Sequence, residues 1–99
     1  MRYEIDFAPS VERHLEALTA RQRKIVYNGI EAHLRSQPNV ETRNRKLMRP
    51  NPLAPWELRL GDLRVYYRVL EEPTKIVEIA AVGMKRREQL WIAGERADV

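Results

Sequence analysis

Hydrophobic and polar positions change period early in the chain. Residues 2–7 alternate polar and apolar side chains, which predicts a half-buried strand. From residue 9 to residue 18, apolar residues recur every three or four positions, as in an amphipathic helix. Thr19 and Gln22 have the spacing of a capping box, and a second apolar stripe follows them until Pro38 interrupts it. The pattern therefore predicts a strand followed by a hairpin of two helices.

The middle of the chain has no sustained period between residues 37 and 55. Four prolines interrupt this segment, so it is predicted to be a long loop. Residues 56–60 and 63–69 then alternate cleanly on either side of Gly61 and Asp62, which predicts two antiparallel strands joined by a two-residue turn.

The last third of the chain begins with residues 76–82, which are nearly all apolar and indicate a central strand that Gly83 ends. A short helix is predicted over residues 85–92, closed by Gly94. The predicted fold is a single α+β domain over residues 1–99. It has an N-terminal strand, a helix hairpin, a three-stranded antiparallel meander and a short C-terminal helix.

The predicted hairpin has a defined register across its turn. Arg59 faces Arg64 on one face, and Glu57 faces Tyr66 on that same face. Leu58 belongs to the other, apolar face, which is expected to meet the helices. Like charges directly opposite each other on a sheet are unfavourable by several tenths of a kcal/mol, so an anion between the two arginines would relieve the conflict.

Charge is concentrated in the same region as the hairpin. The chain carries a formal charge of +4, and residues 43–70 hold seven lysines and arginines against two acidic residues, whereas the flanking segments are close to balance. A local excess of this kind is typical of a surface that meets an anionic partner such as nucleic acid. A solvated charged face is the alternative interpretation.

Composition excludes several classes of function. The absence of cysteine excludes disulfides and thiolate catalysis. His14 and His33 are the only histidines, and they are expected at the surface or the core edge rather than at a metal site. No metal motif or glycine-rich phosphate loop is present, and no cofactor is expected. No apolar run approaches the ~20 residues of a membrane span, and the N-terminus lacks a secretory signal, so a cytoplasmic protein is expected.

Two segments of the chain carry a resemblance to a known family. Residues 56–69 have the form leucine-arginine-leucine, turn, arginine, valine-tyrosine, and residues 81–87 have a valine-glycine followed by a basic cluster. With the preceding strand and helices, the chain resembles the RelE/ParE toxin superfamily of type II toxin–antitoxin systems over almost its whole length. The resemblance implies a fold related to small microbial ribonucleases, with helices on one sheet face and the site on the other. RelE-type members cleave messenger RNA on the ribosome, and ParE-type members instead poison DNA gyrase.

The resemblance also implies a set of catalytic residues. Arg64 matches the arginine that grips the scissile phosphate, and Arg59 and Lys85 match further basic positions of the site. Glu57 stands where the best-studied RelE pattern has a lysine, and is a candidate base. Trp91 lies where that pattern has a catalytic tyrosine. The expected activity is a metal-independent endoribonuclease, or mRNA interferase, in which the RNA 2′-hydroxyl attacks the adjacent phosphate.

Other residues are expected to bind RNA around that centre. Trp91 and Tyr66 are the candidates for base stacking, and the candidates for contacts with the RNA backbone are Arg43, Arg45, Lys46, Arg49, Arg68, Arg86 and Arg87. The expected partners are messenger RNA, the ribosome and a cognate antitoxin protein. A ParE-like gyrase inhibitor and a non-catalytic binding module of the same fold are the alternatives that the sequence leaves open.

Overall fold

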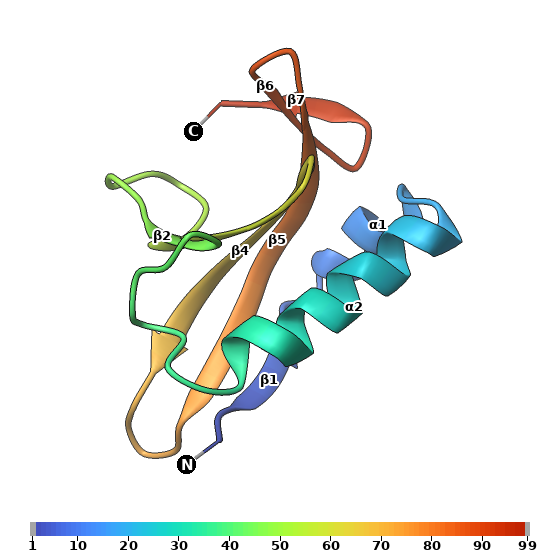
Figure 1. Ribbon diagram of the computed structural model, residues 1–99. Helices are drawn as coiled ribbons and strands as arrows, with labels where there is room; N and C mark the ends of the chain where they lie inside the picture. Colours follow the sequence, from blue (N-terminus) through green and yellow to red (C-terminus); the bar gives the residue numbers. More distant parts are fainter. Residues whose placement is uncertain (1, 99) are drawn as a thin grey trace.

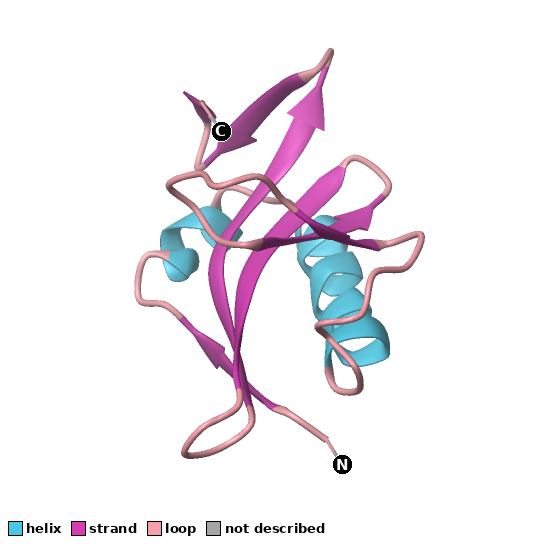
Figure 2. Ribbon diagram, turned by 90° about the vertical axis from the view of Figure 1, so that its left-hand side faces the viewer, coloured by secondary structure: helices cyan, strands magenta, loops and turns pink. Residues whose placement is uncertain are grey.

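The computed structural model describes residues 2–98 and shows an α+β fold in which two helices lie on one face of a seven-stranded sheet (Figures 1 and 2). The elements in chain order are β1 (Glu4–Phe7), α1 (Val11–Glu16), α2 (Ala20–Leu34), β2 (Arg45–Leu47), β3 (Trp56–Leu60), β4 (Leu63–Leu70), β5 (Ile76–Arg86), β6 (Gln89–Ile92) and β7 (Glu95–Ala97).

The sheet is mostly antiparallel. Strands β2 to β7 follow one another across it in chain order, each antiparallel to its neighbour. β1 instead pairs in parallel with the first part of β5, up to Ile79. β6 pairs with the last part of β5, from Met84 onward. Between these two pairings the edge of β5 has no neighbouring strand among residues 2–98, and a side chain of α1 contacts it there.

Two apolar clusters hold the layers together. The main core lies between the helices and one sheet face, and includes Leu34 of α2 with Leu58 of β3 and Tyr67 of β4, all of which are buried. A smaller cluster lies on the opposite face, where Tyr66 packs with Ala54, Ala81 and Leu90. The alternation of side chains along β4 explains the division, because consecutive residues of a strand point to opposite faces.

Several local predictions are confirmed by the structure. The Thr19 side chain accepts a hydrogen bond from the Gln22 backbone N–H at 3.1 Å, and the Gln22 side chain accepts one from the Thr19 N–H at 2.9 Å, so α2 begins with a capping box. In the β3–β4 hairpin, Arg59 pairs with Arg64 and Glu57 pairs with Tyr66, as expected.

The predicted fold is wrong in its sheet and at the C-terminus, because the sheet has seven strands where an N-terminal strand and a three-stranded meander are predicted. Residues 85–92 form no helix: β5 continues to Arg86, and β6 returns antiparallel to it. Arg87 and Glu88 make the connection with positive φ values of 49° and 67°. Such a turn matches the twist of the flanking strands but usually carries glycine or asparagine, so the sequence gives little sign of it. Burial of Leu90 against the second cluster favours the strand.

The predicted loop of residues 37–55 is also interrupted. β2 pairs with β3 inside it, with Lys46 opposite Glu57. Three residues are too few to show an alternating pattern, and the strand exists because β3 offers an edge for pairing. The segment after β2 covers part of the second cluster with Met48, Leu53 and Ala54.

Gly83 lies inside β5, where it was predicted to end the strand. A Cβ atom at this position would lie 2.4 Å from the carbonyl oxygen of Trp91 and 2.8 Å from Cγ1 of Ile92. The strand β6 therefore crosses at a separation that only glycine permits.

Gly83→Ala is accordingly expected to lower the free energy of unfolding by about 1–3 kcal/mol, because the backbone of β6 has to move. Gly61→Asn is the matched control, since Gly61 has a φ of 62° that asparagine tolerates and has no heavy atom within 4 Å of an added Cβ. Urea unfolding of the two variants checks the difference. An unchanged Gly83→Ala protein would contradict the close approach of β6.

Candidate functional site

A cleft of about 680 Å³ lies on the sheet face opposite the helices. We call it the Glu57 pocket, because the carboxylate of Glu57 lies within its wall. Its charged lining residues are four cations and three acidic residues, which are Lys46, Arg49, Arg59, Lys85, Glu57, Glu88 and Asp98. The cations come from β2, the following loop, β3 and β5, so only the folded sheet brings them together.

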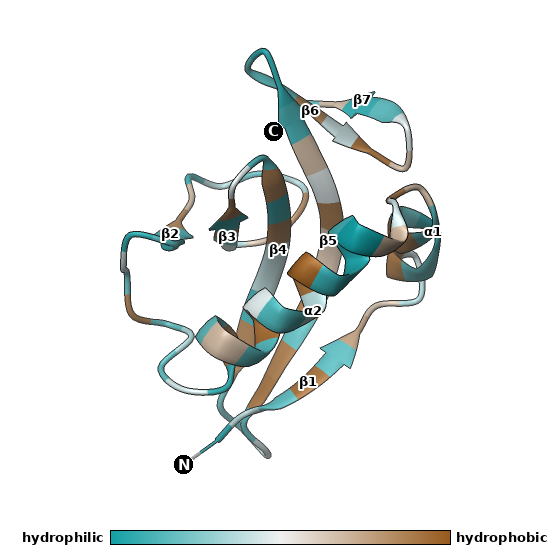
Figure 3. Ribbon diagram, turned by 45° about the vertical axis from the view of Figure 1, so that its right-hand side comes forward, coloured by the Kyte–Doolittle hydropathy of each residue, from teal (hydrophilic) through white to brown (hydrophobic). Residues whose placement is uncertain are grey.

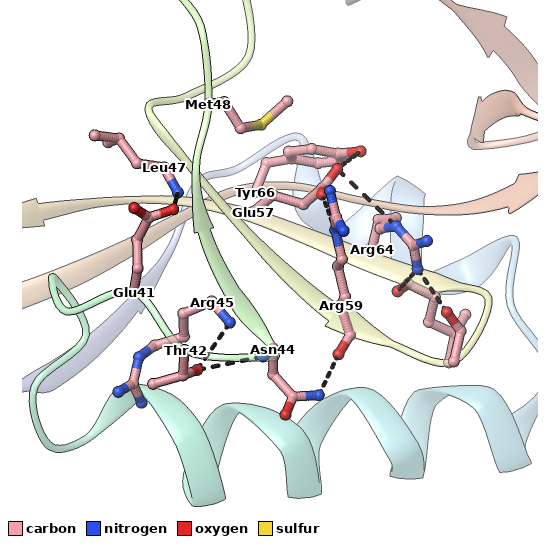
Figure 4. Close-up of polar contacts among 12 residues, drawn as sticks. Glu41, Thr42, Asn44, Arg45, Leu47, Met48, Glu57, Arg59, Arg64 and Tyr66 are labelled. Atoms are coloured by element: carbon pink, nitrogen blue, oxygen red, sulfur yellow. Dashed lines mark hydrogen bonds and ion pairs between the residues drawn. The ribbon is translucent and has the colours of Figure 1, made fainter.

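Glu57 is the most unusual residue of this pocket, because it is only 5% exposed and yet carries a carboxylate. Its Oε1 accepts a hydrogen bond from Nε of Arg59 at 2.6 Å, and its Oε2 accepts one from the Tyr66 hydroxyl at 3.0 Å (Figure 4). Nε of Arg64 lies 4.0 Å from the same Oε2. A buried carboxylate is costly unless it is paired and hydrogen-bonded, and these three side chains meet that requirement.

Tyr66 fixes the position of the carboxylate. Burial, together with the nearby negative charge of Glu57, raises the pKa of Tyr66 well above the usual range for tyrosine. The phenol therefore stays protonated at neutral pH and remains a hydrogen-bond donor. Tyr66 was a stacking candidate, but its ring is only 1% exposed and packs inside the second cluster. The hydroxyl, rather than the ring, takes part in the site.

Glu57 also resolves the conflict between the two opposed arginines. The anion expected between Arg59 and Arg64 is supplied by the chain itself. The two arginines differ in what they can do next. The Arg59 side chain is 49% exposed and lines the pocket. The Arg64 side chain is 14% exposed, and its NH1 donates to the carbonyl oxygens of Gly61 and Leu63 at 2.6 and 2.9 Å.

The structure therefore places Arg59, rather than Arg64, where a ligand of the pocket would meet an arginine. Arg64 donates to the backbone of the hairpin turn, and its Nε lies 4.0 Å from Oε2 of Glu57. Its Nε is buried and has no hydrogen-bond partner. The resemblance implies Arg64 as the phosphate ligand because Arg64 occupies the matching position along the hairpin. Position along a strand does not specify the direction in which a long side chain points.

Lys46 is the site residue whose place the sequence did not reveal. It was expected on a loop along the RNA backbone, but β2 places it directly across from Glu57. The row across the sheet is Lys46, Glu57, Tyr66 and Ala81. The sequence signal for this placement is the alternation of side chains along β2. That strand has only three residues, which are too few for the alternation to be recognised.

The other expected RNA contacts divide into three groups. Arg49 lines the Glu57 pocket, whereas Arg45 is buried and donates to the carbonyl oxygens of Val40 and His33 at 2.8 and 2.7 Å. Arg45 therefore supports the segment after α2 instead of facing solvent. Exposed residues outside the pocket are Arg43, Arg68, Arg86, Arg87 and Trp91. Of these, Arg68 pairs with Glu78 of β5 at 3.0 Å.

His14 has a structural role at the open edge of β5. Its Nδ1 accepts a hydrogen bond from the backbone N–H of Val82 at 3.2 Å. Burial, and secondarily the neighbouring charge of Arg13, lower the pKa of His14 below its usual value. The neutral ring is therefore the form that the fold requires, because a proton on Nδ1 would remove the acceptor.

This arrangement predicts that stability falls with acid. The unfolded chain takes up the His14 proton near pH 6.5 and the folded chain only at lower pH, so the free energy of unfolding decreases as the pH falls from about 7 to 5. His14→Gln should flatten that part of the profile, because an amide does not titrate there. His33→Gln is the control, and urea unfolding across this pH range is the measurement. An equal flattening in the control would contradict the assignment to His14.

Among residues 2–98, no group of three or more histidine and acidic side chains is placed to hold a metal ion. No helix in this part of the chain is long and apolar enough to cross a membrane. No protein-family model matches the chain, and no curated protein sequence matches it. Function is therefore inferred from the geometry and charge of the Glu57 pocket.

Proposed function

We propose that this protein is the toxin of a type II toxin–antitoxin pair, a RelE-like endoribonuclease that cleaves messenger RNA in the Glu57 pocket. The observation that carries the proposal is the buried carboxylate of Glu57, hydrogen-bonded by Arg59 and Tyr66 in a pocket whose wall also carries Lys46, Arg49 and Lys85. A fixed carboxylate surrounded by cationic donors is what RNA transesterification needs, because a proton leaves one oxygen while negative charge builds on phosphorus oxygens.

The proposed reaction uses the RNA 2′-hydroxyl as its nucleophile. The O2′–H bond breaks and its proton passes to Glu57, while a bond forms between O2′ and the adjacent phosphorus. The bond from phosphorus to O5′ breaks, and O5′ takes a proton from the ammonium group of Lys85. The products are a 2′,3′-cyclic phosphate and a 5′-hydroxyl. Proton exchange with solvent then returns Glu57 to its carboxylate form and Lys85 to its ammonium form.

Arg59 links substrate binding to the availability of the Glu57 carboxylate as a proton acceptor. In the structure its guanidinium donates a hydrogen bond from Nε to Oε1 of Glu57. A phosphate entering the pocket competes for the same guanidinium, whose planar fork can grip two phosphate oxygens. Transfer of Arg59 from Glu57 to phosphate frees Oε1 to accept the 2′-hydroxyl proton. Tyr66 keeps its bond to Oε2 and holds the carboxylate in place throughout.

The remaining cations of the pocket serve charge compensation and binding. Lys46 lies across from Glu57, and its ammonium adds positive charge where the phosphate would enter. Arg49 extends the charge along the loop after β2. Arg64 acts as a positioning residue through the hairpin turn and through its charge behind Glu57. A cytoplasmic location, the ribosome as the place of cleavage and a cognate antitoxin that restrains the toxin belong to the same proposal.

The test is cleavage of messenger RNA in a translating extract, followed by mapping of the new ends. We expect cuts with 5′-hydroxyl and cyclic phosphate ends that are absent without the protein. DNA gyrase supercoiling is measured beside it with the same preparation. Inhibition of gyrase without RNA cleavage would replace the proposal with a ParE-like function, and no effect in either assay would leave only a binding role for the pocket.

A further inference from the structure

A second cavity, of about 810 Å³, lies between α1 and the β6–β7 hairpin, on the helix side of the sheet. Figures 1 and 3 show the hairpin extending beyond α1 at the end of β5. Its apolar lining includes Leu18, Val82, Met84 and Trp91. We call it the Trp91 pocket. Its size falls within the range of pockets that enclose small organic ligands.

The polar groups of the Trp91 pocket are of the kind that nucleic acid requires. Three consecutive cations from the end of β5 and its turn line one side, and these are Lys85, Arg86 and Arg87. Asp62 and His14 also line the cavity. Because Nδ1 of His14 is occupied by Val82, its proton lies on Nε2, the one ring nitrogen that remains as a donor for a ligand. The Asp62 carboxylate is an acceptor suited to a base amino group or a ribose hydroxyl.

Trp91 provides the aromatic surface. It is 37% exposed although it is one of the largest side chains of the chain, and it pairs across β6 and β5 with Met84. An exposed indole beside a row of cations is the arrangement with which proteins stack single-stranded bases while they hold the backbone phosphates. Trp91 lines this cavity and not the Glu57 pocket, so it stands apart from the proposed reacting groups.

The two cavities adjoin at the end of the β5–β6 hairpin. The turn between Lys85 and Gln89 separates the two cavities, and both of these residues line each cavity. Figure 3 shows that the tip of β5 and this turn are hydrophilic. An RNA strand that leaves the Glu57 pocket past Lys85 therefore reaches the Trp91 pocket by crossing the positively charged end of β5.

We infer that the Trp91 pocket is a subsite for an unpaired base of the RNA strand that flanks the one cleaved in the Glu57 pocket. The inference rests on the proposed function for its substrate class. The base stacks on Trp91, its phosphate lies against Arg86 or Arg87, and Lys85 contacts the backbone between the two cavities. An acidic protein segment, which would pair with the same three cations, is the competing occupant, and in that case the oligoadenylate probes described next would not bind.

The test uses a nuclease-resistant probe, so that binding is measured separately from cleavage. The probes are a 2′-O-methyl oligoadenylate of six residues and one of two residues. The background variant is Trp56→Phe, which leaves Trp91 as the only tryptophan, since the chain has two. We expect the six-residue probe to quench Trp91 fluorescence and to bind about 5- to 150-fold more weakly to Trp91→Ala, as loss of one stacked base requires. Trp91→Phe should retain most of the affinity, and the two-residue probe should discriminate less between the variants.

The outcomes separate the subsite from the cleavage reaction. Quenching without any RNA cleavage by the wild type supports the subsite and overturns the nuclease proposal. RNA cleavage with an unquenched Trp91, or equal affinity of Trp91→Ala and wild type for the six-residue probe, overturns the subsite and leaves the nuclease proposal standing. Failure of both probes to bind overturns the subsite as well. Thermal melts of each variant establish that it is folded.

Discussion

Glu57→Gln is expected to slow single-turnover RNA cleavage by about two to four decades, because the amide is close in shape to the carboxylate but cannot take the 2′-hydroxyl proton. RNA affinity should not fall, since the substitution removes a negative charge from a pocket that binds phosphate. A separation of rate from affinity is thus the expected result. Single-turnover rates on ribosome-bound messenger RNA, with RNA binding measured in parallel, provide the check.

Two further variants make the Glu57 result interpretable. Glu31→Gln is a matched control, because Glu31 also accepts hydrogen bonds from an arginine, Arg35, but does so on α2. It should cleave at the wild-type rate. Tyr66→Phe removes only the hydroxyl that donates to Glu57, so a smaller loss of rate is expected, with affinity unchanged. Full activity in folded Glu57→Gln would show that the carboxylate is structural and would end the assignment of Glu57 as the base.

Arg59→Lys should reduce the cleavage rate by about two to three decades although the net charge is unchanged. An ammonium group cannot reproduce bidentate contacts with two phosphate oxygens, and removal of a preorganised donor to a developing anion typically costs about 3–4 kcal/mol in the transition state. Ground-state affinity should fall much less. The free energy of unfolding should change by about 1 kcal/mol or less, because Arg59 is half exposed and Glu57 keeps Tyr66 and Arg64.

Arg35→Lys supplies the control for this substitution, because Arg35 makes a bidentate contact with Glu31 at 2.8 Å outside the pocket. Arg64→Lys distinguishes the two arginines of the hairpin. If Arg64 only positions the turn, its lysine variant should lose stability and retain more activity than Arg59→Lys. A greater loss of rate in a fully folded Arg64→Lys protein would return the scissile phosphate to Arg64, as the resemblance implied.

The register of the β3–β4 hairpin shows how far local sequence specifies this site. Gly61 and Asp62 mark a two-residue turn, and the alternation on either side leaves only one pairing that puts Leu58 in the core. The opposition of Arg59 and Arg64 follows from that pairing. The place of Glu57 on the same face follows too, but its role as their shared anion does not. That role depends on how three side chains turn, which alternation does not describe.

The C-terminal segment shows where periodicity misleads. Residues 85–92 have the length and the boundary glycines of a short helix, and nothing local contradicts that interpretation. The strand is favoured because β5 offers an unpaired edge beyond β1, and because Leu90 finds a place in the second cluster. A free strand edge and a buried site for one side chain are properties of the assembled sheet. The sequence of the segment itself does not contain them.

The sequence by itself determined the two helices, the register of β3 and β4, the face on which the arginines lie and the concentration of basic residues there, because each depends on periods and turns within a few residues. Tertiary structure alone decided that β2 would bring Lys46 opposite Glu57, and that the end of β5 would carry Lys85 to the pocket and Trp91 to the other side of the sheet. These placements depend on pairing between strands far apart in the chain. Such pairing is selected by the burial and hydrogen bonding of the whole sheet, to which a short segment contributes only part of the free energy.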